Sequence, residues 1–311
     1  MSAPAVTVVI PTFNGRGRVP RVLEALRAEA GSVEFEVVVV DNASTDGTAA
    51  AVEGHPAAAA LRAAGVEVRV LPEPRAGLTH ARARGVAGAR GGLVCFLDDD
   101  NLPQPGYLAC GVAAFHDAGV GLLTSRVFPR YEAEPAPAMR RREHLLAINH
   151  LLGDEVLDWG ATPSLAPTLG AGLWVRKTAF ARAAGGRLPD RLPGSLSSGG
   201  DVELGVAIGG AGFRRLYVPC LRLWHVIPPE RVRTRYFCRL IYGIVRSRLA
   251  VEALYEGRGG RRRDRAAALA RLLGGAAAVP ALLARRDGRR EALFVLVSRW
   301  AELRGPLRDR V

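Results

Sequence analysis

Three consecutive carboxylates, Asp98, Asp99 and Asp100, directly follow the apolar run 93–97. Carboxylates this close together at the end of a buried strand repel one another unless a positive group compensates. A divalent cation would do so, because hard cations take carboxylate oxygens and keep positions for water or phosphate. Asp98 and Asp100 project to the same side of an extended chain, so these two suit a shared metal site. The alternative is an acidic cluster that caps a helix or lies in water.

The sequence lacks the common phosphate-binding loops. It has neither a G-x-x-x-x-G-K-[ST] loop nor a G-x-G-x-x-G fingerprint after a strand, which argues against P-loop NTPases and dinucleotide enzymes. A cation at the acidic cluster would instead bridge a diphosphate with the help of nearby arginines. Arg75 and Arg82 are the best placed of these.

Apolar, β-branched runs alternate with helical segments in the first hundred residues. The strands are predicted at 6–10, 35–40, 66–71 and 93–97. This alternation is typical of an α/β protein whose parallel sheet is covered on both faces. Ligands bind such sheets at the carboxyl ends of the strands. Polar residues follow three of the predicted strands, namely Thr12 and Asn14, Asp41 and Asn42, and Asp98–Asp100.

The middle of the chain is less regular. The patterns predict a loop over 133–138, a helix over 140–152, a strand over 170–175, a helix from Asp201 to Gly210, and a strand pair or strand-turn over 213–225. The Pro/Gly/Ser-rich stretch 187–200 is predicted to be a loop able to close over a ligand.

Positive charge is concentrated at the C-terminal end. The 311 residues carry a net charge of +13 and are 49% hydrophobic, which excludes a disordered tail protein, a collagen-like repeat and a polytopic membrane protein. Residues 230–311 contain 20 arginines and 8 carboxylates. We therefore predict a catalytic domain at 1–228 and a basic helical region at 229–311.

This basic region contains two apolar stripes. Residues 272–284 are uninterruptedly apolar, and as a helix they would span about 20 Å, short of the ~30 Å hydrocarbon core of a bilayer. The second stripe consists of Leu293, Leu296, Val297 and Trp300. Packing against the catalytic domain is one interpretation, and a solvated basic surface is another. We predict docking on anionic lipid, at the inner face of the cell membrane.

The four cysteines, Cys95, Cys110, Cys220 and Cys238, are far apart and include no C-x-x-C pair. This spacing argues against a disulfide scaffold or a cysteine zinc site and favours a reducing cytoplasm. We also expect no secretion signal, because Met-Ser-Ala-Pro leads directly into a strand pattern.

Taken in order, five segments resemble family-2 glycosyltransferases of the GT-A fold. They are VVIPTFNG (8–15), VVVVDNASTDGT (37–48), EPRAGLTHARARGVAGARGGLVCFLDDDN (73–101), GAGLWVRKTAF (170–180) and GGDVEL (199–204). The resemblance implies a Rossmann-like, mostly parallel sheet flanked by helices. It also implies an inverting transfer from a nucleotide-diphospho-sugar, typically a UDP-sugar, with Mn²⁺ or Mg²⁺ as cofactor.

The resemblance assigns expected roles to individual residues. The nucleotide-sugar would be held by Pro11, Thr12, Asn14, Asp41, Arg75, Arg82, Asp98 and Asp99, with Asp41 accepting a hydrogen bond from the base. The metal would be held by Asp98, Asp100 and His225. For His225 a purely structural role is the alternative, as it is for most single histidines.

Asp201 aligns with the catalytic base of the family and would deprotonate an acceptor hydroxyl, which attacks the anomeric carbon of the sugar. A helix N-cap is the alternative role for this aspartate. Gly200 stands where the family usually has an acidic residue, so Glu203 is kept as a second candidate for the base.

Three functions compete. The first is a hexosyltransferase acting on a sugar, lipid-linked or small-molecule acceptor in polysaccharide (for example cell-envelope), glycolipid or natural-product synthesis. The second is a catalytically inactive GT-A-like module recruited to membranes or polyanions. The third, nucleic-acid binding, is suggested by charge alone and is disfavoured because the chain lacks aromatic stacking motifs and a recognisable reader fold.

Overall fold

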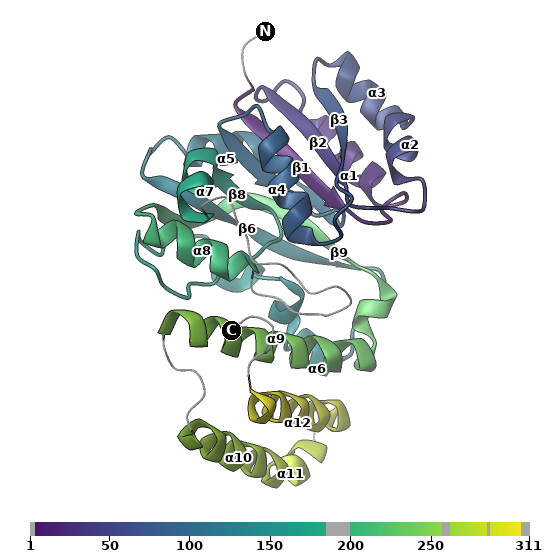
Figure 1. Cartoon of the computed structure of the whole chain (residues 1–311). Helices are drawn as coiled ribbons and strands as arrows, with labels where there is room; N and C mark the ends of the chain where they lie inside the picture. The colour runs from purple at the N-terminus through teal and green to yellow at the C-terminus, as the bar shows by residue number, and fades with distance from the viewer. Residues whose placement is uncertain (1–3, 185–199, 257–261, 285–286, 306–311) are drawn as a thin grey trace. The chain divides into compact units, whose positions relative to one another are not determined.

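The computed structural model describes residues 4–184, 200–256, 262–284 and 287–305 (Figure 1). These residues form two units. The first comprises residues 4–130, 147–184 and 200–226, and the second comprises 131–146 with the described residues from 227 to 305.

The described part of the first unit is built on one mixed sheet. Its strands are β1 (Val6–Thr12), β2 (Phe35–Asp41), β3 (Glu67–Pro72), β4 (Leu93–Phe96), β5 (Asn101–Pro103), β6 (Val120–Tyr131), β7 (Leu157–Asp158), β8 (Leu173–Arg176) and β9 (Arg214–Ile227). The strand order is β3-β2-β1-β4-β8-β6-β9-β5, and β7 pairs with β9.

The two halves of this sheet differ in direction. β1 pairs in parallel with β2 and β4, and β2 pairs in parallel with β3, as the apolar runs predict. In the other half, β8 pairs antiparallel with both β4 and β6, and β5 pairs antiparallel with β9. The register aligns Thr12 with Asp41, so polar residues from two strand ends lie side by side.

Helices cover the sheet and connect its strands. They are α1 (Val19–Leu26), α2 (Thr48–Glu53), α3 (Pro56–Ala63), α4 (Leu78–Gly88), α5 (Tyr107–Ala114), α7 (Lys177–Ala184) and α8 (Gly200–Gly210). α1 buries Val19, Val22, Leu23 and Leu26, the spacing of a one-sided apolar stripe. Short 3₁₀ turns occur at η1 (Arg27–Glu29) and η3 (His150–Leu152).

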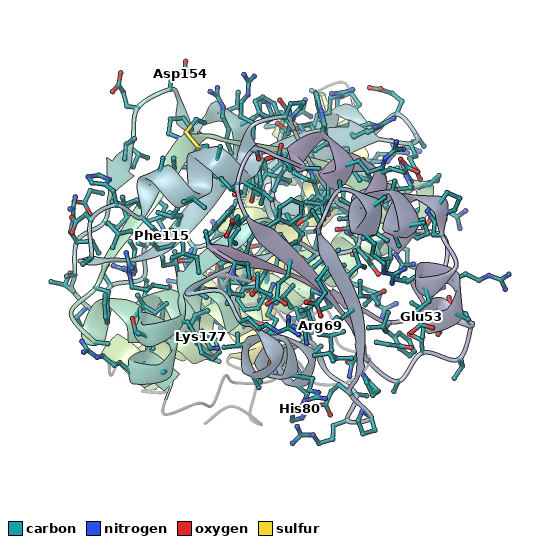
Figure 2. The ribbon with its side chains drawn as sticks, turned by 90° about the horizontal axis from the view of Figure 1, so that it is seen from above. Glu53, Arg69, His80, Phe115, Asp154 and Lys177 are labelled. Atoms are coloured by element: carbon teal, nitrogen blue, oxygen red, sulfur yellow. A yellow bond between two sulfur atoms is a disulfide. The ribbon has the colours of Figure 1, made fainter. Side chains whose placement is uncertain are left out.

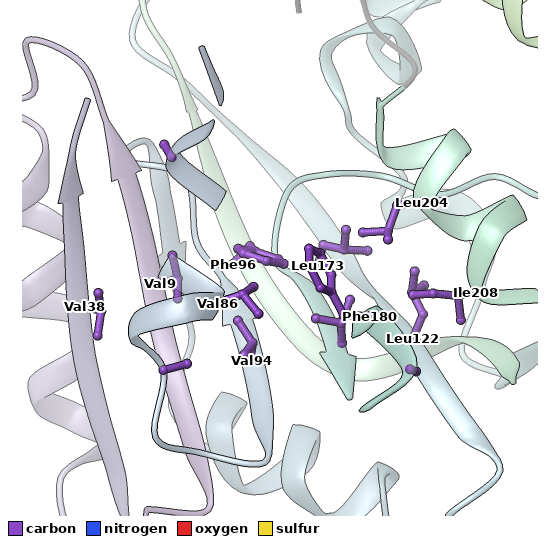
Figure 3. Close-up of a cluster of buried hydrophobic side chains, with 14 of the residues drawn as sticks. Val9, Val38, Val86, Val94, Phe96, Leu122, Leu173, Phe180, Leu204 and Ile208 are labelled. Atoms are coloured by element: carbon purple, nitrogen blue, oxygen red, sulfur yellow. The ribbon is translucent and has the colours of Figure 1, made fainter. Parts of the chain in front are cut away.

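The apolar core explains why α4 and α8 hold fixed positions on the sheet. Val86 from α4 and Leu204 and Ile208 from α8 are buried in one cluster with strand residues such as Phe96 and Leu173 (Figure 3). Burying such side chains stabilises the fold by ~1.5–3 kcal/mol each. The elements that carry the expected site residues are therefore anchored by packing.

The second unit is helical. Its elements are α6 (Pro137–Arg140), η2 (Glu143–Leu146), η4 (Pro229–Val232), α9 (Thr234–Glu256), α10 (Arg262–Ala277), α11 (Val279–Leu283) and α12 (Gly288–Arg304). Helix α12 packs against α9, α10 and α11. The rings of Phe237 and Phe294 meet at 5.2 Å between centroids, and the buried Glu291 pairs with Arg141 and Arg142. None of the described helices is long and apolar enough to cross a membrane.

Several local predictions differ from the structure. The predicted helix over 140–152 is wrong, because the chain forms the short turns α6, η2 and η3 there. In the predicted strand pair or strand-turn over 213–225, residues 214–225 belong instead to one long strand, β9. Strand β6 was not predicted. The predicted loop over 187–200 lies outside the described residues except for Gly200, which begins α8.

The structure also contains a disulfide that the cysteine spacing did not predict. Cys110 of α5 and Cys220 of β9 are bonded across a sequence separation of 110 residues, and the bond is visible in Figure 2. Cysteine spacing along the chain does not reveal this pair, because only the fold brings α5 next to β9. The spacing of the cysteines therefore no longer favours a reducing compartment.

Candidate active site

Arg82 lies between two of the expected site carboxylates. Its Nη1 donates a hydrogen bond to Asp201 Oδ1, and its Nη2 lies 3.6 Å from Asp98 Oδ1. The Arg82 side chain is only 6% exposed, and its guanidinium lies over the ring of Phe96, 5.3 Å from the centroid. One buried cation thus joins the first turn of α8 to the residues that follow β4.

Asp201 is held in place by a close approach of the backbone. A Cβ atom added at Gly170 would lie 2.3 Å from Asp201 Oδ2, so only glycine leaves room for this carboxylate. A Cβ at Gly205 would similarly lie 2.4 Å from Thr168 Oγ1, which shows that α8 packs closely on the segment just before β8. The two carboxylate oxygens of Asp201 therefore face Arg82 and Gly170.

Glu203, the second candidate for the base, is on a different side of α8. Two residues along an α-helix correspond to a rotation of about 200°, so Asp201 and Glu203 cannot face the same neighbours. The Glu203 side chain is buried, and Asp201 is the one that contacts Arg82. The geometry favours Asp201 as the carboxylate that adjoins the acidic cluster.

Asp99 has a different environment from its neighbours. It accepts hydrogen bonds from Thr12 Oγ1 at 2.6 Å and from Arg18 Nε and Nη2 at 3.0 and 2.9 Å. A Cβ at Gly15 would lie 1.9 Å from Thr12 Oγ1, so glycine is needed beside this pair. Asp99 thereby fastens the loop after β1 to the acidic cluster, and Thr12 is engaged in the same contact.

Asp100 and His225 are neighbours across the β5–β9 pairing. Asn101 is aligned with His225, and Val226 N donates to Asp100 O at 2.8 Å. This register places Asp100 Oδ2 3.4 Å from His225 Nε2, with both side chains largely buried. Asp100 Oδ1 also accepts from Asn101 Nδ2 at 3.0 Å. The structure thus brings together two of the three expected metal ligands.

Asn14 connects the loops that follow β1 and β2. Its backbone N donates to Ser44 Oγ at 2.9 Å, and its Oδ1 accepts from Thr45 N at 2.8 Å. It has a φ of 51°, in the left-handed region that asparagine tolerates better than most residues. Asn14 therefore shapes the loops beside the carboxyl ends of these strands. Pro11 lies one step before Thr12 inside β1 and is buried.

Asp41 and Asn42 end β2 and organise the next loop. Asp41 Oδ1 accepts from Ser44 N at 3.1 Å. The Asn42 side chain donates to Glu73 O and Arg75 O and accepts from Gly77 N, at distances from 2.6 to 3.0 Å. Asn42 thus holds the segment that leads into α4, the helix of Arg82.

Arg75 is bound by a neighbouring carboxylate. Its Nε and Nη2 donate to Glu73 Oε1 and Oε2 at 2.9 and 3.1 Å, while its side chain is 68% exposed. The paired guanidinium lowers the pKa of Glu73 to about 2. The structure therefore places Arg75 on the surface of the loop, where its guanidinium pairs with Glu73.

The acidic cluster carries unfavourable charge. Burial, followed by the neighbouring carboxylates of Asp100, Asp201 and Asp99, raises the pKa of Asp98 to about 6, although Arg82 opposes the shift. A second cation beside Asp98 would relieve this destabilisation, because it favours the ionised carboxylate.

These residues suit a cation that binds together with a phosphate-bearing ligand. Among the described residues, no three His, Cys, Asp or Glu side chains gather into a ready-made metal site. Asp100 and His225 supply an oxygen and a nitrogen, and carboxylate oxygens are suitable donors for Mg²⁺ and Mn²⁺. Magnesium in proteins is often held by one or two carboxylates, with phosphate oxygens and water completing its shell.

Sequence reasoning did not identify Arg18, Glu73 or Gly170 as site residues. Gly170 belongs to a segment that carries the family resemblance, and Glu73 lies two residues before Arg75, so both had a local signal. Arg18 had none, because its pairing with Asp99 spans 81 residues of chain.

Residues 7–167, about half of the chain, match the model of glycosyl transferase family 2. An uncharacterized glycosyltransferase of Mycobacterium tuberculosis is 36% identical over 129 residues, 42% of this chain and 51% of that protein. Glycosyltransferase AglE of Haloferax volcanii is 31% identical over 126 residues, 40% of each chain. The succinoglycan biosynthesis protein ExoO of Rhizobium meliloti is 36% identical over 105 residues, 34% of this chain and 28% of that protein. The matches thus span about half or less of these relatives' own length.

Solved structures share the fold. The mannosyltransferase PcManGT from Pyrobaculum calidifontis, solved with GDP-Man and Mn²⁺, has a TM-score of 0.61 at 21% identity, covering 97% of this chain and 88% of that one. S. aureus TarS has a TM-score of 0.54 at 19% identity, covering 80% of this chain and 39% of that one. These similarities confirm the expected GT-A type of α/β fold, and the match of the family model to half of the sequence shows that this chain belongs to glycosyl transferase family 2.

Proposed function

We propose that this protein is an inverting, metal-dependent glycosyltransferase that moves a sugar from a nucleotide-diphospho-sugar, a UDP-sugar, to an acceptor hydroxyl. Family membership supports the reaction class. The observation that carries the proposal is the position of Arg82, whose guanidinium contacts Asp201 on one side and approaches Asp98 on the other.

This arrangement suits a displacement at the anomeric carbon. In the donor, that carbon is bonded directly to the diphosphate, so a base for the acceptor must lie close to the phosphate site. Asp201 is next to the acidic cluster and takes the proton of the acceptor hydroxyl as the new glycosidic bond forms and the bond to the nucleoside diphosphate breaks. The acceptor attacks from the face opposite the leaving group, which inverts the anomeric configuration.

Asp98, Asp100 and His225 are the residues that would hold Mn²⁺ or Mg²⁺. A cation bound there would neutralise the negative charge that develops on the departing diphosphate. The structural similarity to PcManGT, which was solved in complex with GDP-Man and Mn²⁺, supports the use of a divalent cation. Arg82 adds a fixed positive charge nearby and holds Asp201 toward the same region.

The loops after β1 and β2 would bind the nucleoside. Asp41 would accept a hydrogen bond from the base, and Thr12 and Asn14 shape the surrounding loops. S. aureus TarS was solved in complex with UDP and PcManGT in complex with GDP-Man, so these structures do not favour one base. The proposed preference for uracil therefore rests on the family resemblance. The name of ExoO, a succinoglycan biosynthesis protein, supports a polysaccharide-type acceptor among those expected.

The proposal is tested by donor binding and turnover in the same preparation. UDP- and GDP-sugars are screened for thermal stabilisation with Mn²⁺, since a ligand of the folded state raises the melting temperature. Release of nucleoside diphosphate is then measured with Mn²⁺ or EDTA for the wild type, Asp201→Asn and Glu203→Gln. We expect EDTA-sensitive turnover that Asp201→Asn lowers by about 10²–10⁴-fold, with little change in donor affinity.

The other outcomes are equally informative. Loss in Glu203→Gln with normal turnover in Asp201→Asn would transfer the role of base to Glu203. Wild-type protein that binds a donor with Mn²⁺ and gives no turnover with any acceptor would support the inactive binding module instead. Turnover that is insensitive to EDTA would contradict the metal assignment.

A further inference from the structure

Helices α10 and α11 have apolar residues on two opposite sides. The 19 residues from 266 to 284 contain one charged side chain, Arg271, and are otherwise alanine, leucine, glycine, valine and proline. All of them are described by the structure. A helix that is apolar all round is normally buried on all sides.

The inner side packs on α12. Its positions are 268, 272, 275, 279 and 282, which recur at intervals of four and three residues. Ala268 is 3% exposed, and a Cβ at Gly275 would lie 3.2–3.3 Å from side-chain atoms of Arg299 and Val295. Arg271 also turns toward this helix, because its Nε donates to Glu302 Oε2 at 2.7 Å.

The outer side lies open on the second unit. Leu269, Leu273 and Leu283 are 47%, 62% and 52% exposed. Alanine, glycine and proline at 266, 267, 270, 274, 276–278, 280, 281 and 284 are also exposed. We call these exposed residues the α10–α11 outer face. A helix face toward water would ordinarily carry several charged or polar residues, whereas the exposed positions of 266–284 carry one, Arg271, which is 48% exposed and pairs with Glu302.

We propose that the α10–α11 outer face lies in the interfacial layer of an anionic membrane. Charge complementarity favours this occupant over a second copy of the chain. Residues 230–311 contain 20 arginines against 8 carboxylates, which attract anionic lipid and would repel the same region of another copy. Arg289 and Arg304 on α12 are exposed examples.

The length and shape of the helices fit a position along the surface. α10 has 16 residues and α11 has 5, with a break at Ala278 and a proline at 280. At ~1.5 Å per residue, α10 is about 24 Å long, shorter than the ~30 Å hydrocarbon core. A helix pair of this kind can bury its apolar face at the headgroup boundary without crossing the bilayer.

The test is co-sedimentation of the full chain with vesicles of phosphatidylcholine alone or mixed with phosphatidylglycerol. We expect binding to the mixed vesicles, weaker binding in high salt, and at least about a tenfold loss of affinity in Leu269→Glu/Leu273→Glu. Leu283→Glu on α11 is a second, independent variant. Leu151→Glu is the matched control, because Leu151 is an 81% exposed leucine of the first unit. This variant should bind the vesicles as the wild type does.

Three results would overturn the proposal. The first is wild-type protein that stays in the supernatant with anionic vesicles. The second is unchanged vesicle binding by both glutamate variants, when their melting temperatures show that they are folded. The third is a wild-type dimer in sedimentation equilibrium that Leu269→Glu/Leu273→Glu converts to monomer without a change in vesicle binding, which would assign the outer face to a contact between copies. Vesicle binding needs no donor and no turnover, so the result of this test is independent of the proposed glycosyltransferase activity.

Discussion

Arg82 and Asp201 are 119 residues apart in the chain and form a direct ion pair, with Arg82 Nη1 donating to Asp201 Oδ1. The pair is largely buried, since the two side chains are 6% and 22% exposed. In such surroundings the loss of either partner leaves an uncompensated charge. The position of the proposed base therefore depends on a helix from the other half of the first unit.

Replacing Arg82 by lysine should impair turnover more than donor binding. Lysine keeps the positive charge and loses the planar fork that contacts Asp201 and Asp98 together. A displacement of the base of about 1 Å can cost ~10²-fold in rate, so we expect a fall in kcat of that order with a small change in KM for the donor. Steady-state kinetics measure both. Arg84→Lys, on the exposed side of the same helix, is the control, and equal losses in both variants would contradict a specific role for Arg82.

Gly170→Ala should displace Asp201. The added Cβ would lie 2.3 Å from Asp201 Oδ2, a separation that requires the carboxylate to move. We expect turnover to fall by at least about tenfold, because the base leaves its position, while donor-induced thermal stabilisation is retained.

Gly210→Ala provides the matched control for this change. It lies at the end of the same helix as Asp201, and its added Cβ would meet only Pro163 Cβ, at an ordinary 3.7 Å. Its turnover should equal that of the wild type. Normal turnover in Gly170→Ala would show that Asp201 does not need its observed position.

Metal binding should weaken as the pH falls below about 6. Burial and the neighbouring carboxylates raise the pKa of Asp98 to about 6, so in the metal-free protein a proton occupies this group at lower pH and competes with the cation. The raised pKa also means that Asp98 makes the metal-free fold less stable as the pH rises from about 4 toward 6. Bound Mn²⁺ should cancel this loss.

Thermal shift measurements with and without Mn²⁺ at pH 5, 6 and 7.5 test this expectation. The Mn²⁺-induced rise in melting temperature should be small at pH 5 and reach its full value above pH 6. Asp98→Asn removes this titrating group and leaves the other two expected ligands, so the pH dependence should be clearly weaker in that variant. An Mn²⁺ effect with the same pH dependence in both proteins would rule out Asp98 as its cause.

The Cys110–Cys220 disulfide should contribute substantially to stability. It closes a loop with a sequence separation of 110 residues, and loops of this length correspond to ~4–5 kcal/mol in the chain-entropy model. We expect Cys110→Ser/Cys220→Ser to unfold at lower urea concentration than the wild type. Cys238→Ser, at an unpaired cysteine, is the control. Identical unfolding midpoints for the oxidised wild type and the double variant would contradict a stabilising role.

Local sequence patterns were sufficient to predict the strands of the parallel half of the sheet. Continuous β-branched runs such as 35–40 cannot be solvated on either face, so they predict buried strands, and strand ends predict where polar loops meet. The order of the motifs was sufficient to identify the family, which the family-model match confirms. The same patterns failed over 140–152, where apolar and charged residues with helical spacing form only short turns.

The contacts between side chains were decided by the tertiary structure. The sequence by itself indicated that Asp98, Asp100 and Asp201 were candidate site residues. It did not determine that Arg82 would join two of them, that Asp99 would be fastened to Arg18, or that Cys110 would bond to Cys220. The physical reason is that the Arg18–Asp99, Cys110–Cys220 and Arg82–Asp201 pairings span 81, 110 and 119 residues of chain, so no local periodicity encodes them. They arise only when the strands and helices pack together in the folded unit.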